Sequence, residues 1–326
     1  MERTWSTLQS KAKRGRFVGI NAALFSAFFL GLAPIFGKQA IQMGLHPLPL
    51  VAMRTLFATV LMFIVMLIFQ RRFLYIYPAG LFGCLLAGWI NGLGSLFYYS
   101  ALGNIDAGVG QLLYSIYPLF VAVWMSFDKQ PPSRLTVFRL LIALPAIYLL
   151  VQANGETPSI IGVVEMLIAS ALFALHLPIN QRVLYDIPAP TVTLYTLLAM
   201  SSVVVPTFLF SGSITSFPAT LNYIWPLAGL TLVTFFSRIT LFTGVKHLGG
   251  MQTAFIGLGE LLITIFLARF WLGEMMSSSQ LLGALILGVS LLLIGLEKPI
   301  SPKSRKGGWF SWLTPPSSDI SLHTGE

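Results

Sequence analysis

Long apolar runs joined by short connections are the feature that most constrains how this chain can fold. A helix needs about 20 mostly apolar residues to cross the hydrocarbon core of a bilayer. Runs of that length recur along the whole sequence, and we expect ten spans, near residues 17–37, 48–69, 79–100, 106–127, 134–152, 159–181, 190–211, 223–245, 250–271 and 278–297. The runs are continuous rather than alternating, which favours helices over the strands of a closed barrel.

The composition agrees with a chain whose main solvent is lipid. Only 10% of the 326 residues are charged, the mean hydropathy is +0.80, and a soluble domain carries about 25% charged residues. We therefore predict an all-α, multi-pass integral membrane protein with the lipid bilayer as a partner. The single cysteine, Cys84, excludes an intrachain disulfide. The basic surplus lies between apolar runs rather than on a folded polar surface, so no nucleic-acid partner is expected.

The distribution of Lys and Arg predicts the orientation in the membrane. With a cytoplasmic N-terminus, the outer segments hold only Lys38 and Arg269, and Arg54, Arg139 and Arg238 fall within spans. All the other basic residues among the 20 then lie on the inner side, which is the side that Lys and Arg prefer. Both termini are therefore expected to be cytoplasmic, and the plasma (inner) membrane is the expected location. The oligomeric state stays open.

A ten-residue phrase occurs twice in the chain. Residues 47–56 and 188–197 share the pattern Pro-x-Pro-x-Val-x-x-x-Thr-Leu, and each copy opens an apolar run. Five spans separate the copies, so a duplicated second half must enter the membrane from the opposite side. We predict two inverted five-helix repeats, at 17–152 and 153–297, with a basic cytoplasmic tail at 1–16 and a cytoplasmic tail at 298–326 that is expected to be disordered. Such repeats place a binding site near the bilayer midplane and indicate transport.

The motifs resemble one known family, the EamA-type transporters of the drug/metabolite transporter superfamily. The second half ends with Gly259-Glu260-Leu261, Leu272-Gly273-Glu274 and the Gly-Ala-x-Leu-Ile-type stretch 280–289; in the first half Arg54, Ala101-Leu102 and Pro118 stand at the family's usual places. The chain departs from the family pattern at Leu261, where a proline is usual, and at residues 128–131, where Leu-Gly-Glu would stand.

This resemblance implies a ten-helix secondary transporter, an exporter of amino acids or related small metabolites that works by alternating access. The first alternative is a carrier of nucleotide sugars or lipid-linked sugars, which a basic cavity facing the cytosol would favour. An alternative of another class is a membrane scaffold or an intramembrane enzyme. No phosphate-binding loop, dinucleotide fingerprint or His/Cys cluster is found in the sequence, so we expect no enzyme activity, catalytic residue, cofactor or metal.

Charged residues inside the spans are the first candidates for a site, because each costs about 2.5–3.5 kcal/mol at the centre of an inserted helix. Glu260 and Arg238 are expected at depths that differ by about 5 Å. They form either a substrate or proton site or a structural ion pair. Arg54 either binds a substrate carboxylate through its two-pronged guanidinium or holds a neighbouring segment.

Glu165 and His176 are eleven residues apart, which is about three helical turns and about 16 Å. Both therefore share one face of their span. With Glu260 they are candidates for coupling transport to protons, because carboxylates and histidines mark proton relays in membranes. The alternative is an interfacial glutamate and a buried structural histidine.

Aromatic and amide side chains in the third and fourth spans are the remaining candidates for binding a small-molecule solute. We expect the cavity to be lined by Trp89, Asn91, Gln111, Tyr114 and Tyr117. The competing interpretation is that the aromatic residues pack between helices or anchor the bilayer interface. Pro118 frees a backbone carbonyl in the fourth span, which a neighbouring group must satisfy. Gly88 and Gly92 are four residues apart and permit a close helix contact.

Overall fold

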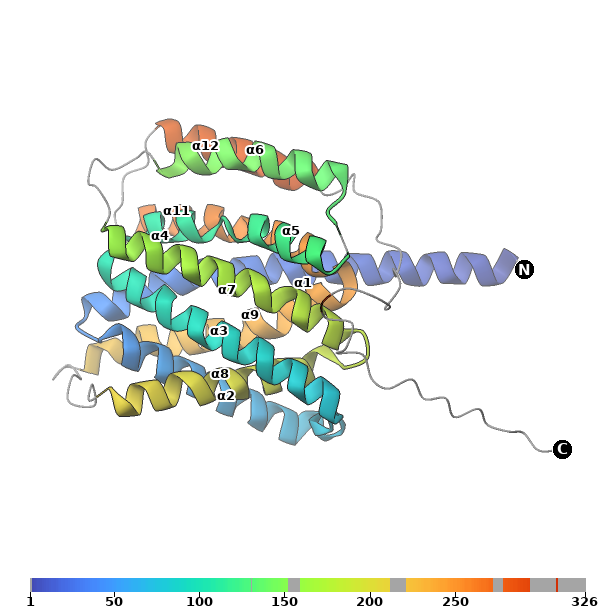
Figure 1. Ribbon diagram of the computed structural model, residues 1–326, viewed down its shortest axis with the longest axis horizontal. Coiled ribbons are helices and arrows are strands. Elements are labelled where there is room, and N and C mark those ends of the chain that lie inside the picture. The colour runs from blue at the N-terminus through green and yellow to red at the C-terminus, as the bar shows by residue number, and fades with distance from the viewer. Residues whose placement is uncertain are drawn as a thin grey trace.

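A computed structural model describes residues 2–129, 131–151, 159–211, 221–271 and 278–293, together with Trp309. Within these ranges the chain is helical and contains no strand (Figure 1). The first half comprises α1 (Glu2–Gln42), α2 (Pro47–Phe69), α3 (Pro78–Asn104), α4 (Ala107–Tyr114), α5 (Tyr117–Phe127) and α6 (Arg134–Val151); the second comprises α7 (Ile160–Leu184), α8 (Ala189–Phe210), α9 (Ile224–Leu248), α10 (Gly250–Gly257), α11 (Gly259–Trp271) and α12 (Ser278–Leu292). Apart from Trp309, the expected C-terminal tail lies outside the described residues.

Seven stretches of the described residues are long and apolar enough to cross a membrane. Each of the ten expected ranges coincides with a helix, and in two cases with a pair of consecutive helices, α4 with α5 and α10 with α11. The first helix already begins at Glu2, so residues 2–16 of the expected tail form the first turns of α1. The outward surface carries large apolar side chains, among them Phe63, Ile64, Phe138, Leu141, Phe266 and Phe270. Such a surface fits lipid, and the chain is a multi-pass membrane protein.

The repeated ten-residue phrase begins the second helix of each half. Its prolines lie in the first turn of α2 and at the N-cap and in the first turn of α8, where a missing backbone N–H costs nothing. The repeated valine and threonine also form the same contact in both copies. Thr55 Oγ1 donates to the Val51 carbonyl at 2.7 Å, and Thr196 Oγ1 donates to the Val192 carbonyl. The two copies are therefore alike in hydrogen bonding as well as in sequence.

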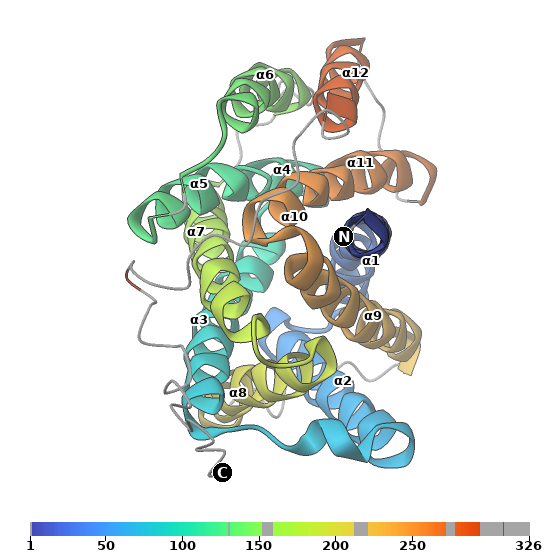
Figure 2. The ribbon, with the colours of Figure 1, turned by 90° about the vertical axis from the view of Figure 1, so that its right-hand side faces the viewer.

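The packing repeats in the same way between the halves. The helix α1 packs mainly against α9 and α11, and α7 packs mainly against α3 and α5. Thus the first helix of each half is embedded among the third and fourth elements of the other half. In Figure 1, α1 and α7 run in opposite directions, and α2 lies against α8. Figure 2 shows α6 and α12 side by side at one edge of the bundle.

The edge pair α6 and α12 is fastened to the bundle through Arg139. Its Nε donates to the Ser290 carbonyl at 3.2 Å, and Ser290 Oγ donates back to the Arg139 carbonyl at 3.0 Å. The guanidinium carbon lies 3.6 Å from the ring centroid of Phe255 in α10, a cation–π geometry. This arginine, which was expected within a span, therefore contacts neighbouring helices and lies outside the cavity described below.

Close contact between α3 and α8 depends on two glycines, as their spacing predicted. A Cβ atom at Gly88 would lie 2.5 Å from Ala199 Cβ and 2.6 Å from the Thr196 carbonyl oxygen. One at Gly92 would lie 3.1 Å from Val203 Cβ. There is no room for a side chain at Gly88, and one at Gly92 would require Val203 to shift, so the two helices approach closely through their backbones.

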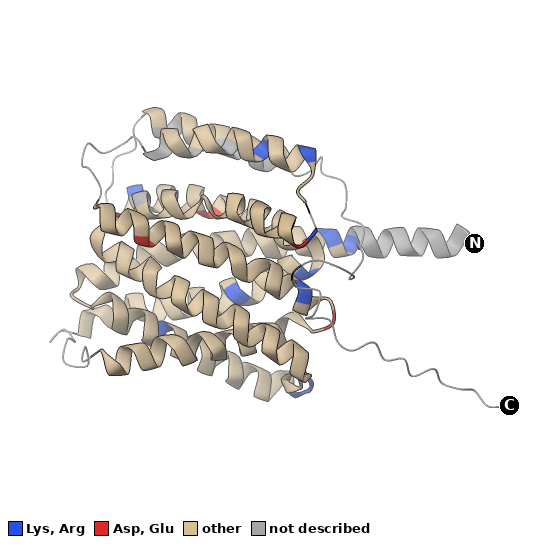
Figure 3. Cartoon of the chain, in the orientation of Figure 1, with Lys and Arg blue, Asp and Glu red and all other residues tan. Residues whose placement is uncertain are grey.

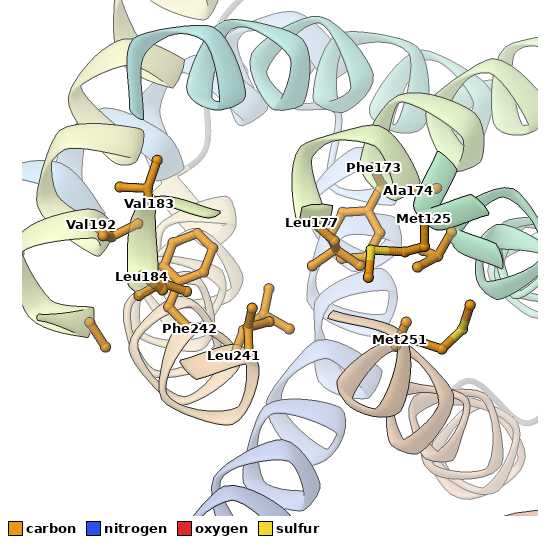
Figure 4. Close-up of a cluster of buried hydrophobic side chains, with 14 of the residues drawn as sticks. Met125, Phe173, Ala174, Leu177, Val183, Leu184, Val192, Leu241, Phe242 and Met251 are labelled. Atoms are coloured by element: carbon orange, nitrogen blue, oxygen red, sulfur yellow. The ribbon is translucent and has the colours of Figure 1, made fainter. Parts of the chain in front are cut away.

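Two layers of buried apolar side chains lie toward the two ends of the bundle. We call the end where α1 begins and α7 ends the near end, and the opposite end the far end. At the near end, Figure 4 shows side chains from α5, α7, α8, α9 and α10 packed together; the labelled members are Met125, Phe173, Ala174, Leu177, Val183, Leu184, Val192, Leu241, Phe242 and Met251. The far-end layer includes Leu45, Leu50, Tyr99, Leu102, Met166 and Leu227.

Different polar contacts reinforce the two ends. Most Lys and Arg residues drawn in Figure 3 lie toward the near end. There Arg182 Nε donates to Asp128 Oδ2 at 2.8 Å, and each side chain is only 1% exposed. At the far end Lys38 Nζ donates to the carbonyls of Leu102 (3.0 Å) and Ile105 (2.9 Å) and lies 4.0 Å from the exposed Asp106 carboxylate. The near end is thus held by a dry ion pair and the far end by a partly hydrated lysine.

Replacing Asp128 with Asn leaves the buried Arg182 guanidinium without its countercharge. We expect the free energy of unfolding to fall by about 3–5 kcal/mol. The matched control is Asp106→Asn, which removes an exposed partner and should cost less than about 1 kcal/mol. Denaturant unfolding of the protein in mild detergent measures both values. Equal losses in the two variants would show that the buried pair contributes no more than the exposed one.

Candidate functional site

A polar cavity lies between the two apolar layers, about halfway along the helices. Residues of α1, α2, α3, α4, α7, α9 and α11 line it; its polar members are Arg54, Asn91, Ser95, Tyr98, Tyr99, Gln111, Tyr114, Arg238 and Glu260, and its apolar members include Leu30, Ala33 and Phe173. Its volume is about 50 Å³, which is room for a few water molecules. Small-molecule pockets measure about 300–1,000 Å³, so in this conformation the cavity is too small to hold a metabolite.

Arg54 reaches the cavity from the second turn of α2. Its Nη1 donates to Thr234 Oγ1 at 3.0 Å and its Nη2 to Ser95 Oγ at 3.2 Å. The guanidinium carbon lies 4.5 Å from the ring centroid of Tyr99. The Nε atom is buried without a hydrogen-bond partner. No acidic residue in the described part of the chain lies within ion-pair distance of this arginine, so its charge is held by hydroxyls and an aromatic face alone.

Arg238 enters the same cavity from α9. With the amide of Asn91 turned so that its oxygen faces the guanidinium, that oxygen accepts from Nη1 at 3.1 Å and Nη2 at 2.9 Å. Amide orientation is assigned from such partners. The guanidinium carbon also lies 5.8 Å from the ring centroid of Phe173. Arg238 and Arg54 line the same cavity, so their positive charges repel each other.

Glu260 brings a carboxylate to the same place from the first turn of α11. A helix N-terminus stabilises a negative charge there. The side chain is only 1% exposed, and its Oε1 has no hydrogen-bond partner. Glu260 and Arg238 attract each other, but the described residues contain no ion pair between them at 4.0 Å or less. The charges that face the cavity are therefore one carboxylate and two guanidinium groups.

The break between α4 and α5 places Gln111 and Tyr114 at the cavity. Pro118 has no N–H, so the Tyr114 carbonyl, four residues earlier, cannot receive its usual helical hydrogen bond. Ser170 of α7 donates its hydroxyl to that carbonyl at 2.9 Å. The freed carbonyl expected from the sequence is thus satisfied by the other half of the protein. Tyr98 completes this wall by donating to Gln111 Oε1 at 3.1 Å.

Six of the eight residues expected to bind substrate line this one cavity: Arg54, Asn91, Gln111, Tyr114, Arg238 and Glu260. Two lie elsewhere. Trp89 is 41% exposed on the outer surface, and its indole N–H donates to Ser202 Oγ at 3.1 Å. Tyr117 is buried beside the cavity, and its hydroxyl donates to the Ala254 carbonyl at 2.9 Å.

The three candidates for proton coupling are not brought together in the structure. Glu165 lies toward the far end, in a separate groove, where Ser100 Oγ donates to its carboxylate at 2.8 Å. His176 is fully buried, and its Nδ1 forms a hydrogen bond with the Phe173 carbonyl. The Phe173 ring, which lines the cavity, packs on the His176 imidazole with centroids 4.6 Å apart. Glu260 alone of the three faces the cavity.

Several residues of the site were not singled out from the sequence. Ser95 and Tyr98 follow Asn91 at four and seven residues, the spacing of one helix face, and both line the cavity. That spacing is a signal that could have found them. Thr234, which holds Arg54, lies four residues before Arg238 on α9. Ser170 gives no such signal, because its role depends on a carbonyl in the other half.

Two like halves of apolar helices, with charged residues gathered between them at mid-depth, define the class of membrane transporters with internal repeats. Comparison with known proteins makes this class more specific. The EamA-like transporter family matches the chain twice, over residues 17–152 and 160–296, and the chain belongs to that family. The resemblance read from the sequence motifs is confirmed, and the protein is a transporter by family.

Individual relatives agree with the family. The chain is 24% identical over 282 residues to a Bacillus subtilis (strain 168) protein described as the uncharacterized transporter YcbK, covering 81% of this chain and 87% of that protein. A solved structure described only as the crystal structure of a protein superposes with a TM-score of 0.67 at 16% identity, covering 87% of this chain and 98% of the other. At that identity the superposition supports the fold alone.

Replacing Ser170 with Ala removes the partner of the Tyr114 carbonyl. We expect a loss of about 1–3 kcal/mol in the free energy of unfolding, because a buried acceptor is left without a hydrogen bond. The matched control is Ser126→Ala: the exposed Ser126 donates at 2.7 Å to the Ala122 carbonyl, which keeps its helical partner. Unfolding in mild detergent should distinguish the two. A Ser170→Ala protein as stable as Ser126→Ala would mean that another group satisfies the break.

Proposed function

We propose that this protein is a secondary transporter that exports small organic metabolites, amino-acid-like solutes foremost, by alternating access at the central cavity. The observation that carries the proposal is the convergence of Arg54, Arg238 and Glu260 on one cavity at mid-depth. Charged groups are kept there at a cost, so the arrangement is best explained by a ligand that needs them.

The balance of charge supports a ligand with both an anionic and a cationic or hydrogen-donating group. Two guanidinium groups and one carboxylate leave one positive charge in excess, which favours a carboxylate on the ligand. The unpartnered Oε1 of Glu260 can accept from an ammonium group. An α-amino acid carries both groups on one carbon. Tyr99, Tyr114 and Phe173 supply aromatic surface for its side chain.

The same charges weigh against a nucleotide sugar. A diphosphate would gain from Arg54 and Arg238 but would face the Glu260 carboxylate in the same closed space. The third intramembrane arginine, Arg139, is committed to Ser290 and Phe255 at the edge pair α6–α12 and does not add to the cavity. A zwitterion uses all three cavity charges and is therefore the better match.

The small volume of the cavity supports alternating access. The cavity is much smaller than a metabolite site and lies between apolar layers at both ends. Room for a solute is therefore gained when one layer separates while the other stays packed. Inverted repeats move in this way, as one group of helices rocks against another.

Counterflow in proteoliposomes tests the function. We expect saturable exchange of a radiolabelled amino acid within a panel of amino acids, purines, sugars and polyamines. Arg54→Gln should raise the half-saturation concentration about 10- to 100-fold, as expected for loss of a charge-assisted hydrogen bond worth about 1.5–3 kcal/mol. Trp89→Phe is the control, because Trp89 lies on the outer surface. Exchange of sugars alone, or an Arg54→Gln protein indistinguishable from Trp89→Phe, would contradict the assignment.

Coupling to protons is proposed through Glu260. Of the three candidates it faces the cavity, is almost fully buried and has an unpartnered oxygen. If a proton binds there, Glu260→Gln should make exchange indifferent to an imposed pH gradient. Glu165→Gln is the matched control and should stay gradient-dependent, because Glu165 lies in the far-end groove. If exchange by the unmodified protein does not depend on the imposed pH gradient, proton coupling is contradicted and transport is driven by the solute gradient alone.

We also propose ten membrane-crossing segments in two inverted repeats, with both termini cytoplasmic in the plasma membrane. The excess of Lys and Arg at the near end supports this orientation. Cys84 is buried and is the single cysteine, so Cys84→Ser provides a background for labelling. An impermeant maleimide added outside cells should then modify Gln42→Cys at the far end and leave Arg72→Cys at the near end unmodified. The reverse pattern would invert the topology.

A further inference from the structure

The break between α10 and α11 contains no proline. The helices α10 and α11 are separated at Leu258, and the position where the family pattern has a proline is Leu261 in this chain. Sharp interruptions in helices have identifiable causes, and insertion of a side chain into the hydrogen-bond ladder is one of them. In the first half Pro118 supplies the cause. In the second half another group must do so.

The backbone hydrogen bonds at this break identify the group. In a continuous helix the Leu258 N–H would donate to the Ala254 carbonyl. It donates instead to the Phe255 carbonyl at 3.2 Å. The Ala254 carbonyl accepts from the hydroxyl of Tyr117, at 2.9 Å. A tyrosine of the first half therefore occupies the hydrogen-bond position that the helix leaves open.

Position 257 must be a glycine for the Tyr117 hydroxyl to lie where it does. A Cβ atom on Gly257 would overlap the Tyr117 hydroxyl oxygen, and it would lie 3.3 Å from Tyr117 Cζ. The hydroxyl thus fills the space that a side chain at 257 would need. The close approach and the hydrogen bond both place the Tyr117 hydroxyl directly against the α10–α11 break.

Tyr117 also joins the two breaks. It is the first residue of α5, directly after the interruption that Pro118 causes. Its ring packs against Tyr114 (centroids 5.6 Å apart) and Phe173 (5.0 Å), both of which line the cavity. Glu260 follows Leu258 by two residues, so the geometry of the second break sets where its carboxylate stands.

We propose that Tyr117 is a positioning residue for Glu260. Its hydroxyl competes with the Leu258 N–H for the Ala254 carbonyl and so keeps α10 and α11 apart with the Glu260 carboxylate in the cavity. When this hydrogen bond is absent, α10 and α11 join toward a continuous helix, and Glu260 turns out of the cavity. The role in transport depends on the function proposed above, whereas the placement of Glu260 can be measured without any transported solute.

The experiment compares Tyr117→Phe with Tyr195→Phe. Tyr195 is a matched control because its hydroxyl also donates to a backbone carbonyl, that of Leu74 at 2.7 Å, far from the cavity. The readout of position is the rate at which a hydrophobic carbodiimide modifies Glu260 in the purified protein, followed by mass spectrometry. In Tyr117→Phe we expect modification to slow by about 2- to 12-fold, as expected for loss of one net hydrogen bond, and the half-saturation concentration for counterflow to rise. Tyr195→Phe should match the unmodified protein.

A second variant guards against an effect on folding alone. Gly257→Ala should displace the hydroxyl and slow the modification of Glu260 in the same way. In the double variant Tyr117→Phe/Gly257→Ala the hydroxyl is already absent, so the two effects should not add. Full additivity, or a Tyr117→Phe protein whose Glu260 reacts as in Tyr195→Phe, overturns the proposal. Slower modification together with no transported solute supports the positioning role and counts against the proposed function alone.

Discussion

The constraint on which this structure depends is that every backbone N–H and carbonyl buried in the bilayer needs a partner within the protein. Continuous helices satisfy it without help, but the helices that form the cavity are interrupted. Each interruption frees a carbonyl, and in each case a hydroxyl of the other half takes it: Ser170 for Tyr114 and Tyr117 for Ala254. The interruptions bring Gln111, Tyr114 and Glu260 to the cavity. The site therefore depends on each half supplying a hydrogen-bond donor to the interrupted helix of the other half.

The two halves share a fold but differ in chemistry. At equivalent positions of the repeated phrase the first half has Arg54 and the second has Tyr195. The arginine contributes a charge to the cavity, whereas the tyrosine hydroxyl donates a hydrogen bond to the Leu74 carbonyl at the near end. Duplication therefore supplied the scaffold, and divergence at a few positions made the cavity asymmetric. An asymmetric cavity can bind a solute whose two ends differ.

Much of this could be predicted from the sequence, and for a physical reason. Apolar runs in lipid have few alternatives to helices, and charged residues inside them must face protein, so the ranges of the helices and the similar depth of Arg238 and Glu260 followed from composition and spacing. That Arg54 lies in the same cavity was not predicted from spacing. Aromatic residues gave weaker predictions, because rings suit lipid, packing and ligands alike. Trp89 is two residues from Asn91 and so projects from a different face of α3. The break at Leu258 could not be foreseen, since Leu261 gives no sign of it and its partner Tyr117 lies in the other half.

The two ends differ in how far water reaches their charged contacts, and this difference has a further consequence. Dissolved ions screen charges that water reaches, over about 8–10 Å at physiological ionic strength, and hardly affect buried pairs. The Lys38 contacts at the far end are partly hydrated, whereas the Asp128–Arg182 pair at the near end is dry. Raising the ionic strength at the far end should therefore weaken the Lys38–Asp106 attraction and leave the Asp128–Arg182 pair almost unchanged.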